Sequence, residues 1–445
     1  MNNIEPLLIR WLLQFLLAKA QMVGETSQMT LKSLIIPVAT ACTLLMATLV
    51  FSSSSNADSA RDDDALSRLS GAAAFQQFID DMRSQALKKG ISAQIYNQAT
   101  RGLKTDPRVT KLASNQPEFN TQIWKYLNTR VSGKRITTGR KMKARHAAKL
   151  AAISKRYGVD RHILLAIWGM ESNYGSYKGN MSIIRSLATI GYQGRRAKFG
   201  RKQLLAALDI LQKGDIPVGK FTGSWAGAMG HTQFIPTTYN SFAVDWTGDG
   251  KRDIWNSVSD ALASTANYLS KSSWKPTRPW GWEVTLPKGF NYANIGPSGK
   301  RTTKRWKALG VKPARGKYFG TDDEIARLIL PAGAKGPAFL ITQNFKAILA
   351  YNASVSYALA VAHLADRIAG KKPFRAKWPV NDRPLSSKER HELQKRLTAK
   401  GFDTGGITGR FGRTTSAAIK AYQRKSGLVP DGYANHNLLN RLRNK

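Results

Sequence analysis

The feature that most constrains the fold is an apolar run that begins after Asp160 and ends on Glu171. Asp160 is a good N-cap, and Leu164, Ile167 and Trp168 recur at helical spacing, so the run predicts a helix with an inward apolar face. Glu171 lies three, four and seven residues beyond these positions and falls on the same face. Because burial disfavours a charged carboxylate, it should raise the pKa of Glu171 and keep a proton available near neutral pH.

Two interpretations of Glu171 are open from this helix alone. The carboxylate could cap a neighbouring helix or pair with one of the many arginines, or it could be a catalytic acid. The following segment, Ser172-Asn173-Tyr174-Gly175, favours a functional site. Small, amide and aromatic side chains beside a buried acid suit sugar binding.

Charge and cysteine content limit the classes of function. The 445 residues predict two or three folded units, and 69 Lys+Arg against 28 Asp+Glu give a formal charge of +41. This charge indicates a polyanionic partner, which could be nucleic acid, an anionic membrane or an acidic cell-wall polymer. A single cysteine, Cys42, excludes an internal disulfide framework and a Cys-based zinc site. Six scattered histidines without an HExxH motif do not suggest a catalytic transition metal.

The N-terminal part predicts export. Residues 33–51 carry no charge and follow Lys32, which is typical of a signal peptide, and Ser55-Asn56-Ala57 offers a cleavage site after Ala57. The alternative is an uncleaved membrane anchor, since the run is near the lower length of a spanning helix. We therefore assign residues 1–57 to a signal peptide or anchor and residues 58–72 to a polar linker.

The rest of the chain reads as mostly helical. Amphipathic spacing covers residues 73–157 and 181–213, and residues 338–369 form a long apolar helical stretch. Residues 371–384 contain three prolines and no helical or strand period, which indicates a linker. Residues 385–445 predict a small unit of three helices.

A second informative stretch covers residues 223–242, with the sequence Gly-Ser-Trp-Ala-Gly-Ala-Met-Gly-His-Thr-Gln-Phe-Ile-Pro-Thr-Thr-Tyr-Asn-Ser-Phe. Its small residues allow close approach of the backbone, and Ser224 and Gln233 offer neutral hydrogen-bonding groups. This combination suits a substrate groove. A Gly-rich apolar segment can also be a tight helix-packing site.

Four ordered motifs within roughly residues 73 to 370 resemble the lytic murein transglycosylase B family. They are Gly-Met-Glu-Ser-Asn-Tyr-Gly, Gly-Ser-Trp-Ala-Gly-Ala-Met-Gly-x-x-Gln-Phe-x-Pro, Asp-x-Thr-Gly-Asp-Gly and Ala-Tyr-Asn-Ala-Ser. The resemblance implies a lysozyme-like, mostly α-helical catalytic domain over residues 73–370. It implies a lyase of cell-wall turnover, in the periplasm of a Gram-negative bacterium, that cleaves the β-1,4 bond between MurNAc and GlcNAc in peptidoglycan and leaves 1,6-anhydro-MurNAc ends.

The same resemblance assigns roles to individual residues. Glu171 would be the catalytic acid/base, Ser224 and Gln233 would hold the substrate, and other cleft residues would be Tyr126, Tyr268, Tyr351, Asn352 and Tyr357. Ordinary glycosidases use two carboxylates. In this family's reaction one carboxylic acid suffices, because the N-acetyl group of the substrate assists and the muramic acid 6-hydroxyl attacks in place of water. No cofactor is required for this chemistry.

Three rival functions have to be weighed. A lysozyme-type hydrolase would need a second carboxylate, which the sequence does not locate. A non-catalytic wall-binding protein would explain the C-terminal unit but not an inward-facing acid. A nucleic-acid binder would explain the charge, yet the chain has no zinc finger, RNP motif or clear basic helix-turn-helix, and an exported chain would not meet a genome.

The segment that starts at Asp245 resembles the first part of a calcium loop, with Gly250 at the required turn. It departs from the standard loop at Thr247 and Asn256. The resembled family implies completion by Asp260, so the candidate ligands of a structural Ca2+ or Na+ are Asp245, Thr247, Asp249, Lys251 and Asp260. The alternative is an Asp/Gly-rich turn without an ion.

Residues 385–445 are similar to the peptidoglycan-binding domain 1 family, a three-helix wall-binding module. One departure is Thr408-Gly409, where the family usually has Asp-Gly. The predicted partners are therefore peptidoglycan glycan strands, with N-terminal membrane association if the apolar segment is retained and with no nucleic acid.

Overall fold

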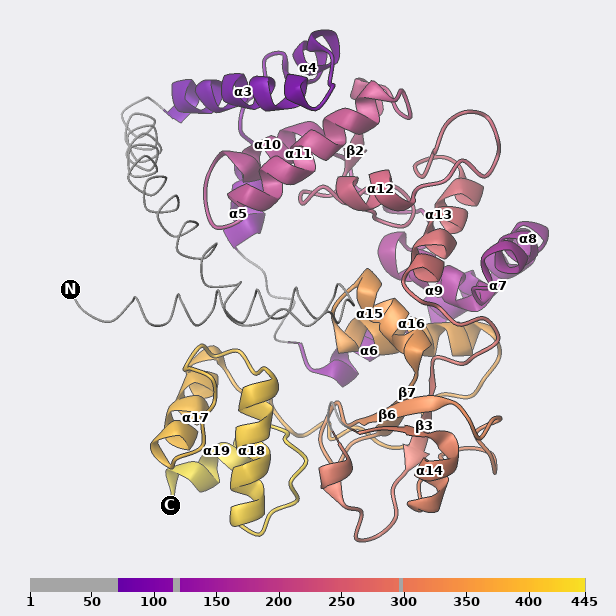
Figure 1. The fold of residues 1–445 in the computed structure, drawn as a ribbon, viewed down its shortest axis with the longest axis vertical. Coiled ribbons are helices and arrows are strands. Elements are labelled where there is room, and N and C mark those ends of the chain that lie inside the picture. Colours follow the sequence, from indigo (N-terminus) through magenta and orange to yellow (C-terminus); the bar gives the residue numbers. More distant parts are fainter. Residues whose placement is uncertain (1–70, 115–120, 296–298, 445) are drawn as a thin grey trace, which may run out of the picture. The chain divides into compact units, whose positions relative to one another are not determined.

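The computed structural model describes residues 71–114, 121–295 and 299–444 (Figure 1). It divides the chain into two units, residues 1–74 and 75–445. The predicted signal peptide or anchor, and the predicted polar linker up to residue 70, lie outside the described residues.

The prediction of a mostly α-helical chain is confirmed. Ahead of the C-terminal unit, most of the helices precede a small sheet region in the chain, one lies within it and two follow it. In chain order they are α3 (Gly71–Lys88), α4 (Ala93–Thr100), α5 (Pro107–Ser114), α6 (Ile123–Arg130), α7 (Gly133–Arg145), α8 (Ala147–Tyr157), α9 (Arg161–Ser172), α10 (Ile183–Tyr192), α11 (Ala197–Gln212), α12 (Pro236–Phe242), α13 (Val258–Lys271), α14 (Thr303–Ala308), α15 (Gln343–Tyr351) and α16 (Val355–Ile368). Two short 3-10 turns, Val218–Lys220 and Tyr292–Asn294, lie in connecting loops.

The helix α9 forms as the sequence predicts. The Asp160 carboxylate accepts a hydrogen bond from the His162 N–H at 2.6 Å, and Asn173, with φ of 50°, ends the helix in the left-handed region. Every residue from Ile163 to Met170 is buried. This helix packs against α16, which is equally apolar, and the two form the centre of the largest core. Burial on nearly all sides explains why both sequences lack a polar face.

A second core joins α3, α4, α10 and α11. Phe75 and Phe78 of α3 pack with Leu187 of α10 and with Leu204 and Leu208 of α11. Between α9 and α12, the two-residue strands β1 (Met181–Ser182) and β2 (Thr222–Gly223) pair antiparallel, which brings the Gly-rich stretch back toward the end of α9.

A five-stranded antiparallel sheet was not predicted. Its order is β4-β6-β7-β3-β5, formed by β3 (Gly281–Thr285), β4 (Lys300–Thr302), β5 (Lys312–Pro313), β6 (Ile325–Ile329) and β7 (Ala338–Ile341). The register pairs Gly281 with Ile341 and Val284 with Ala338. Trp306 of α14 lies buried on the sheet and donates its indole N–H to the Ala326 carbonyl at 3.0 Å, closing a small separate core.

The prediction of one long helix over residues 338–369 is wrong. Residues 338–341 form the strand β7, and the remainder forms α15 and α16, which are bent by 115° at the break between them. The short apolar run of β7 has no distinguishing period, so its spacing cannot be separated from that of a buried helix. At the bend, the Ser354 hydroxyl accepts from the Tyr357 N–H at 3.3 Å and starts α16 as an N-cap.

The C-terminal three-helix unit is confirmed as a helical module. It consists of α17 (Ser387–Ala399), α18 (Arg413–Lys425) and α19 (His436–Arg443), around a core that includes Leu393, Ile419 and Leu439. Ser386 and Glu389 form a capping box at the start of α17.

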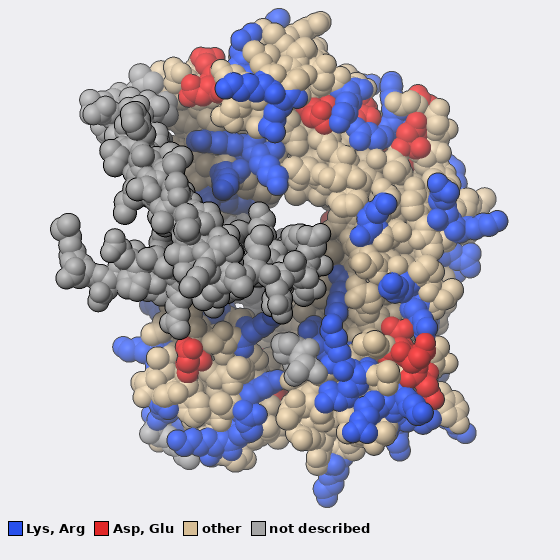
Figure 2. All heavy atoms as spheres, viewed as in Figure 1, with Lys and Arg blue, Asp and Glu red and all other residues tan. Residues whose placement is uncertain are grey.

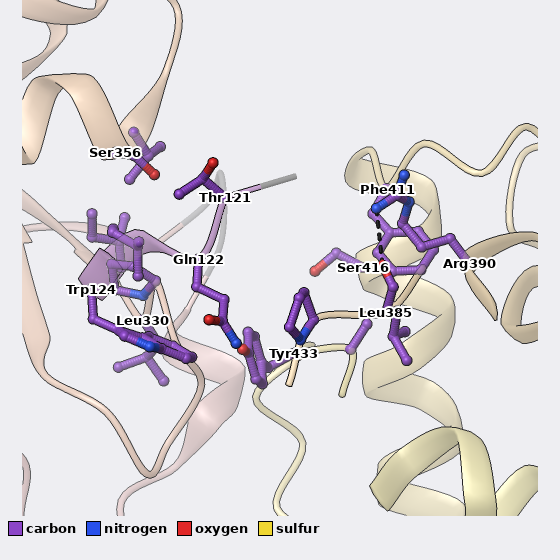
Figure 3. A pocket seen from close by; sticks show the side chains of 16 residues that line it. Thr121, Gln122, Trp124, Leu330, Ser356, Leu385, Arg390, Phe411, Ser416 and Tyr433 are labelled. Carbon is purple, nitrogen blue, oxygen red and sulfur yellow. Dashed lines mark hydrogen bonds between the residues drawn. The ribbon is translucent and has the colours of Figure 1, made fainter. Parts of the chain in front are cut away.

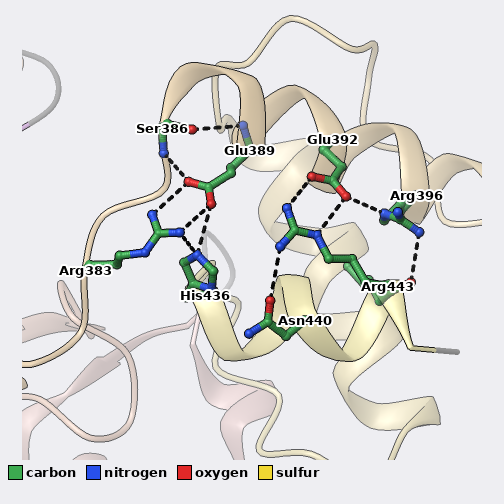
Figure 4. A network of polar contacts seen from close by, with 9 residues as sticks. Arg383, Ser386, Glu389, Glu392, Arg396, His436, Asn440 and Arg443 are labelled. Atoms are coloured by element: carbon green, nitrogen blue, oxygen red, sulfur yellow. Dashed lines mark hydrogen bonds and ion pairs between the residues drawn. The ribbon is translucent and has the colours of Figure 1, made fainter.

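Two carboxylates of α17 also hold the ends of this module together, as Figure 4 shows. Glu389 contacts Arg383 at 2.6 Å and His436 at 3.0 Å, and Glu392 contacts Arg396 at 2.8 Å and Arg443 at 2.6 Å. These pairs connect α17 with the preceding segment and with α19.

The predicted linker at 371–384 contains no helix or strand, but it packs on the domain that precedes it. Phe374 stacks on His363 with ring centroids 3.9 Å apart, and the Arg375 and Ala376 N–H groups donate to the Glu283 carboxylate. In the described part of the chain, no single helix is long and apolar enough to cross a membrane; the bent pair α15 and α16 meets that criterion only when taken together.

Candidate active site

Glu171 lies in the last turn of α9 and is half-buried. The phenol of Tyr357, in the first turn of α16, donates a hydrogen bond to Glu171 Oε1 at 2.5 Å. Burial, together with the negative charge of Glu171, raises the pKa of Tyr357 well above its usual range. Tyr357 is therefore a protonated donor across the whole working pH range, and it fixes one carboxyl oxygen of the predicted acid.

Two further predicted tyrosines lie next to this pair. Burial raises the pKa of Tyr351 well above its ordinary value, and Glu171 adds to the shift. Its hydroxyl donates to the Thr232 carbonyl at 2.5 Å. Tyr268 packs edge-on against Tyr351 with ring centroids 5.1 Å apart, and donates to the Ala350 carbonyl at 2.5 Å.

The other two predicted cleft residues are less closely tied to Glu171. Tyr126 of α6 is half-buried, and its electrostatic influence on Tyr357 places it near that phenol. The Arg130 guanidinium lies over the Tyr126 ring, 5.5 Å from its centroid. Asn352 is exposed at the end of α15, where its carbonyl accepts from the Ser354 N–H at 2.8 Å and shapes the bend.

The Gly-rich stretch folds into a tight loop that carries Ser224 and Gln233. The Ser224 hydroxyl accepts from the Ala228 N–H at 2.9 Å, and Gln233, with φ of 54°, donates to the Lys178 carbonyl at 3.0 Å. Gly230 has φ of 69°, and a Cβ there would overlap the Ile254 backbone. The side chains of Ser224 and Gln233 thus hold the loop together, and their predicted contact with substrate stays a prediction.

The loop is fastened to α9 through Ser172 and Trp168, which the sequence analysis named, and through His231, which it did not select. The Ser172 hydroxyl donates to the His231 carbonyl at 2.6 Å, and the Trp168 indole N–H donates to His231 Nδ1 at 3.0 Å. Only one signal could have drawn attention to His231, namely a polar ring inside a stretch of small and apolar residues. Thr232 contributes its backbone carbonyl, which accepts the hydrogen bond from Tyr351. A backbone contact of this kind cannot be predicted from the type of side chain.

Three of the predicted metal ligands come together. Carboxylate oxygens of Asp245, Asp249 and Asp260 lie within 4.8 Å of one another. Burial raises the pKa of Asp260, which is fully buried and accepts N–H bonds from Trp246 and Asp253. An all-oxygen set of this kind fits a hard cation such as Ca2+.

The remaining two predicted ligands contribute differently. The Thr247 hydroxyl donates to the Asp245 carboxylate at 3.2 Å, and the Lys251 N–H donates to Asp249 at 2.9 Å. Neither contact identifies a ligand atom.

A cavity of about 610 Å³ is lined by residues of α6, α16 and the C-terminal module, and Glu171 is not among its lining residues (Figure 3). Trp124 of α6 and Ser356 of α16 line it together with Arg390, Ser416 and Tyr433 of the C-terminal module. The Ala334 N–H donates to the Asp431 carboxylate at 2.8 Å, and the Lys420 ammonium donates to the Ile295 carbonyl at 3.0 Å. The module is thus in direct contact with the domain that carries Glu171.

A helical domain in which a half-buried carboxylic acid accepts a hydrogen bond from a tyrosine, beside a Gly-rich loop held against its helix, fits a lysozyme-like glycan-cleaving enzyme. Comparison with known families agrees with this class. A family described as "Transglycosylase SLT domain" matches residues 74–366, and one described as a peptidoglycan binding domain matches residues 386–442. The chain belongs to the SLT transglycosylase family and carries a C-terminal peptidoglycan-binding domain.

Relatives extend this assignment. The membrane-bound lytic murein transglycosylase B of Escherichia coli K12 is 28% identical over 309 residues, which are 66% of this chain and 82% of that protein. Crystal structures of SltB3 from Pseudomonas aeruginosa, in complex with NAG-anhNAM-pentapeptide and with NAG-NAM-pentapeptide, are 50% identical, with a TM-score of 0.80, and cover 83% of this chain and 99% of SltB3. Slt35 of Escherichia coli in complex with calcium is 28% identical, with a TM-score of 0.55, over 67% of this chain and 93% of Slt35.

Proposed function

We propose that this lytic transglycosylase cleaves the bond between MurNAc and GlcNAc in peptidoglycan and that Glu171 performs both proton transfers. The observation that carries this proposal is the hydrogen bond from Tyr357 to Glu171 Oε1 at the end of a buried helix. Further support comes from SltB3, which is 50% identical over 83% of this chain and was crystallised with NAG-NAM-pentapeptide and with NAG-anhNAM-pentapeptide.

Both proton transfers use the same oxygen of the Glu171 carboxyl group, Oε2, because Oε1 accepts the hydrogen bond of Tyr357. While Tyr357 donates to Oε1, the acidic proton of Glu171 resides on Oε2 and is given to the leaving glycosidic oxygen. The substrate N-acetyl group assists at the anomeric carbon. The carboxylate then takes the proton of the muramic acid 6-hydroxyl, which attacks to close the 1,6-anhydro ring. The phenol of Tyr357 stabilises the carboxylate between the two steps.

The remaining predicted site residues surround this acid. Tyr351 and Tyr268 supply aromatic surface beside it, and Ser224 and Gln233 belong to the loop that lies against its helix. Tyr126 and Asn352 complete the proposed cleft from α6 and from the bend after α15. These side chains orient the glycan and do not transfer protons.

The substitution Glu171→Gln tests the mechanism. It preserves shape and hydrogen bonding but cannot donate a proton, so release of anhydro-muropeptides should fall by about two to four orders of magnitude while binding is retained. Mass spectrometry of digested sacculi measures this directly. Release of anhydro products at the wild-type rate by the variant would show that the carboxylate is structural.

The same measurement separates the lysozyme-type alternative. A hydrolase leaves reducing MurNAc ends, whereas the proposed reaction leaves anhydro ends that are lighter by one water.

The charge of the chain fits a wall polymer as partner. Lys and Arg side chains are spread over the face shown in Figure 2, with Asp and Glu in a few smaller groups. We assign residues 73–370 to catalysis, residues 371–384 to the connection and residues 385–445 to wall binding. The uncharged run at 33–51 supports export to the periplasm, with N-terminal membrane association if the segment is not cleaved.

The wall-binding module offers an exposed loop for this contact. Ile407 and Phe411 are exposed beside Arg410 and Arg413. At the departure from the family pattern, the Thr408 hydroxyl accepts from the Arg410 N–H at 3.3 Å, which is a contact that an Asp could also make. The loop therefore keeps its turn despite the substitution.

We assign a structural role to the Asp245 loop, with Ca2+ or Na+ as the cation. Asp245, Asp249 and Asp260 supply the carboxylates, and the ion would fix the loop before α13. The calcium complex of Slt35 supports the choice of ion. Catalysis itself needs no cofactor.

A further inference from the structure

His231 is a buried ring, 8% exposed, at the junction of two segments. The ring atom Nδ1 accepts a hydrogen bond from the indole N–H of Trp168 at 3.0 Å. The backbone carbonyl of His231 accepts one from the Ser172 hydroxyl at 2.6 Å, and its backbone N–H donates to the Ile254 carbonyl at 2.9 Å. The Trp168 and His231 rings meet edge-on, with centroids 5.6 Å apart.

The two partners on α9 bracket the catalytic acid. Trp168 precedes Glu171 by three residues, and Ser172 follows it directly. Both contacts therefore hold the final helical turn from which Glu171 extends. On the other side, a Cβ at Gly175 would overlap the His231 ring, so the chain just beyond the helix closes against the same residue.

The loop that carries His231 also carries the other site groups. The Thr232 carbonyl accepts a hydrogen bond from the Tyr351 hydroxyl, and the next residue, Gln233, has a positive φ. A shift of His231 would move these groups relative to the Glu171 carboxyl. Catalytic rates depend on such placement, because a displacement of about 1 Å can cost about a hundredfold.

We propose that His231 is a positioning residue, which locks the Glu171 turn to the Gly-rich loop through the acceptor nitrogen that it presents to Trp168. The proposal rests on the function proposed for Glu171. It requires the neutral ring with its proton on Nε2, because an indole N–H can only donate and Nδ1 must accept.

The surroundings keep the ring in this state. Burial, with smaller contributions from Lys178 and His146, lowers the pKa of His231 to about 4, although Asp253 acts in the opposite direction. Between pH 5 and pH 8 the contact with Trp168 is therefore intact. Below about pH 4, protonation of Nδ1 would place two donors, the His231 Nδ1–H and the Trp168 indole N–H, opposite each other. The hydrogen bond would be lost and the loop released.

Steady-state kinetics on a soluble NAG–NAM tetrasaccharide test the proposal. His231→Phe keeps an aromatic ring but has no acceptor, so kcat should fall about 10- to 100-fold, whereas KM should change by less than about threefold. In His231→Asn the amide oxygen can take the place of Nδ1, so most of kcat should return. His363→Phe is the matched control, since His363 is another histidine with a lowered pKa, its ring is stacked on Phe374, and the variant should keep the wild-type kcat.

A double-mutant cycle identifies the partner. Trp168→Phe removes the donor, and its loss of kcat should not add to that of His231→Phe, because both break one contact. Wild-type kcat in a folded His231→Phe variant, equal losses for His231→Phe and His231→Asn, or fully additive losses in the cycle would each overturn the proposal. Glu171→Gln, assayed in parallel, reports on the proposed function separately, because its activity does not depend on the outcome at His231.

Discussion

The Tyr357 phenol illustrates how one hydrogen bond can serve two steps of a reaction. It is buried and uncharged, and it reaches Glu171 Oε1 at 2.5 Å, so it restricts the carboxyl group without competing for its proton. A donor to a carboxylate also stabilises the ionised form that must exist between the two transfers.

Replacing this phenol separates positioning from acid chemistry. Tyr357→Phe keeps the ring in the core of α16 but removes the O–H, so kcat should fall about tenfold or somewhat more, since a hydrogen bond to a charged group contributes about 1.5 to 3 kcal/mol. The loss should remain smaller than that of Glu171→Gln. The rate of anhydro-product formation by both variants checks the order, and an equal or larger loss in Tyr357→Phe would contradict it.

Buried histidines also predict how stability depends on pH. Burial lowers the pKa of both His231 and His363 from 6.5 to about 4. Between pH 6.5 and pH 4 these two histidines bind protons in the unfolded chain but stay neutral in the folded chain. The free energy of unfolding should therefore decrease as the pH falls from 6.5 to 4, by at most about 3 kcal/mol for each ring.

Urea unfolding at several pH values measures this slope. His231→Asn and His363→Phe should each flatten it, because neither replacement titrates. The carboxyls of Glu389 and Glu392, whose pKa is lowered to about 2 by hydrogen bonds and Arg partners, begin to lose their contribution below about pH 5, so the slope of the histidines is measured between pH 6.5 and about pH 5. An unchanged slope in both variants would contradict the assignment.

At the scale of elements, the sequence predicted what local patterns determine. Asp160, the apolar run and the inward Glu171 specified α9, because an N-cap and a 3.6-residue period are local signals. The five-stranded sheet was missed because its strands have two to five residues, too few to establish a period of two. The bend after Tyr351 was missed although Asn352 and Ser354 mark it. Apolar residues continue on both sides of the bend, so the pattern looks like one uninterrupted helix.

The site follows the same division. The prediction of Glu171 rests on its own helix, and the prediction of Ser224 and Gln233 rests on a local motif that resembles a known family. The role of His231 depends on Trp168, 63 residues earlier in the chain, and only the packing of the folded chain reveals that contact.

The Asp245 loop gives a prediction at this scale. If Asp245, Asp249 and Asp260 hold Ca2+, adding Ca2+ after treatment with a chelator should raise the Tm, because a ligand that binds only the folded chain stabilises it. Asp249→Asn should reduce the gain, while kcat at 25 °C should stay unchanged in both states. A Tm that is indifferent to Ca2+ and Na+ would favour the turn without an ion.

At the scale of the whole molecule, charge and modularity act together. Residues 385–445 contain 13 Lys+Arg and 4 Asp+Glu, so the module contributes nine of the +41 net charges. Such a surface accelerates encounter with an anionic polymer and loses strength as salt screens it.

Removal of the module should separate binding from cleavage. Deleting residues 385–445 should weaken binding to sacculi while the remaining domain still cuts soluble glycan. A full-length variant with Arg410→Ser and Arg413→Ser controls for the domain surface uncovered by the deletion, because the contacts of Asp431 and Lys420 remain. Pull-down on sacculi at low and high salt measures both, and unchanged binding of the deleted form would argue against the wall-binding role.

The hydrogen bond between Tyr357 and Glu171 joins residues that are 186 positions apart in the chain. The loop that carries Gln233 and the bend that carries Tyr351 come from between them. No fragment that ends before Tyr357 contains this arrangement, and an extended chain does not bring its parts together. A peptidoglycan-cleaving enzyme built in this way is thus inert until it folds, and the act of folding switches it on.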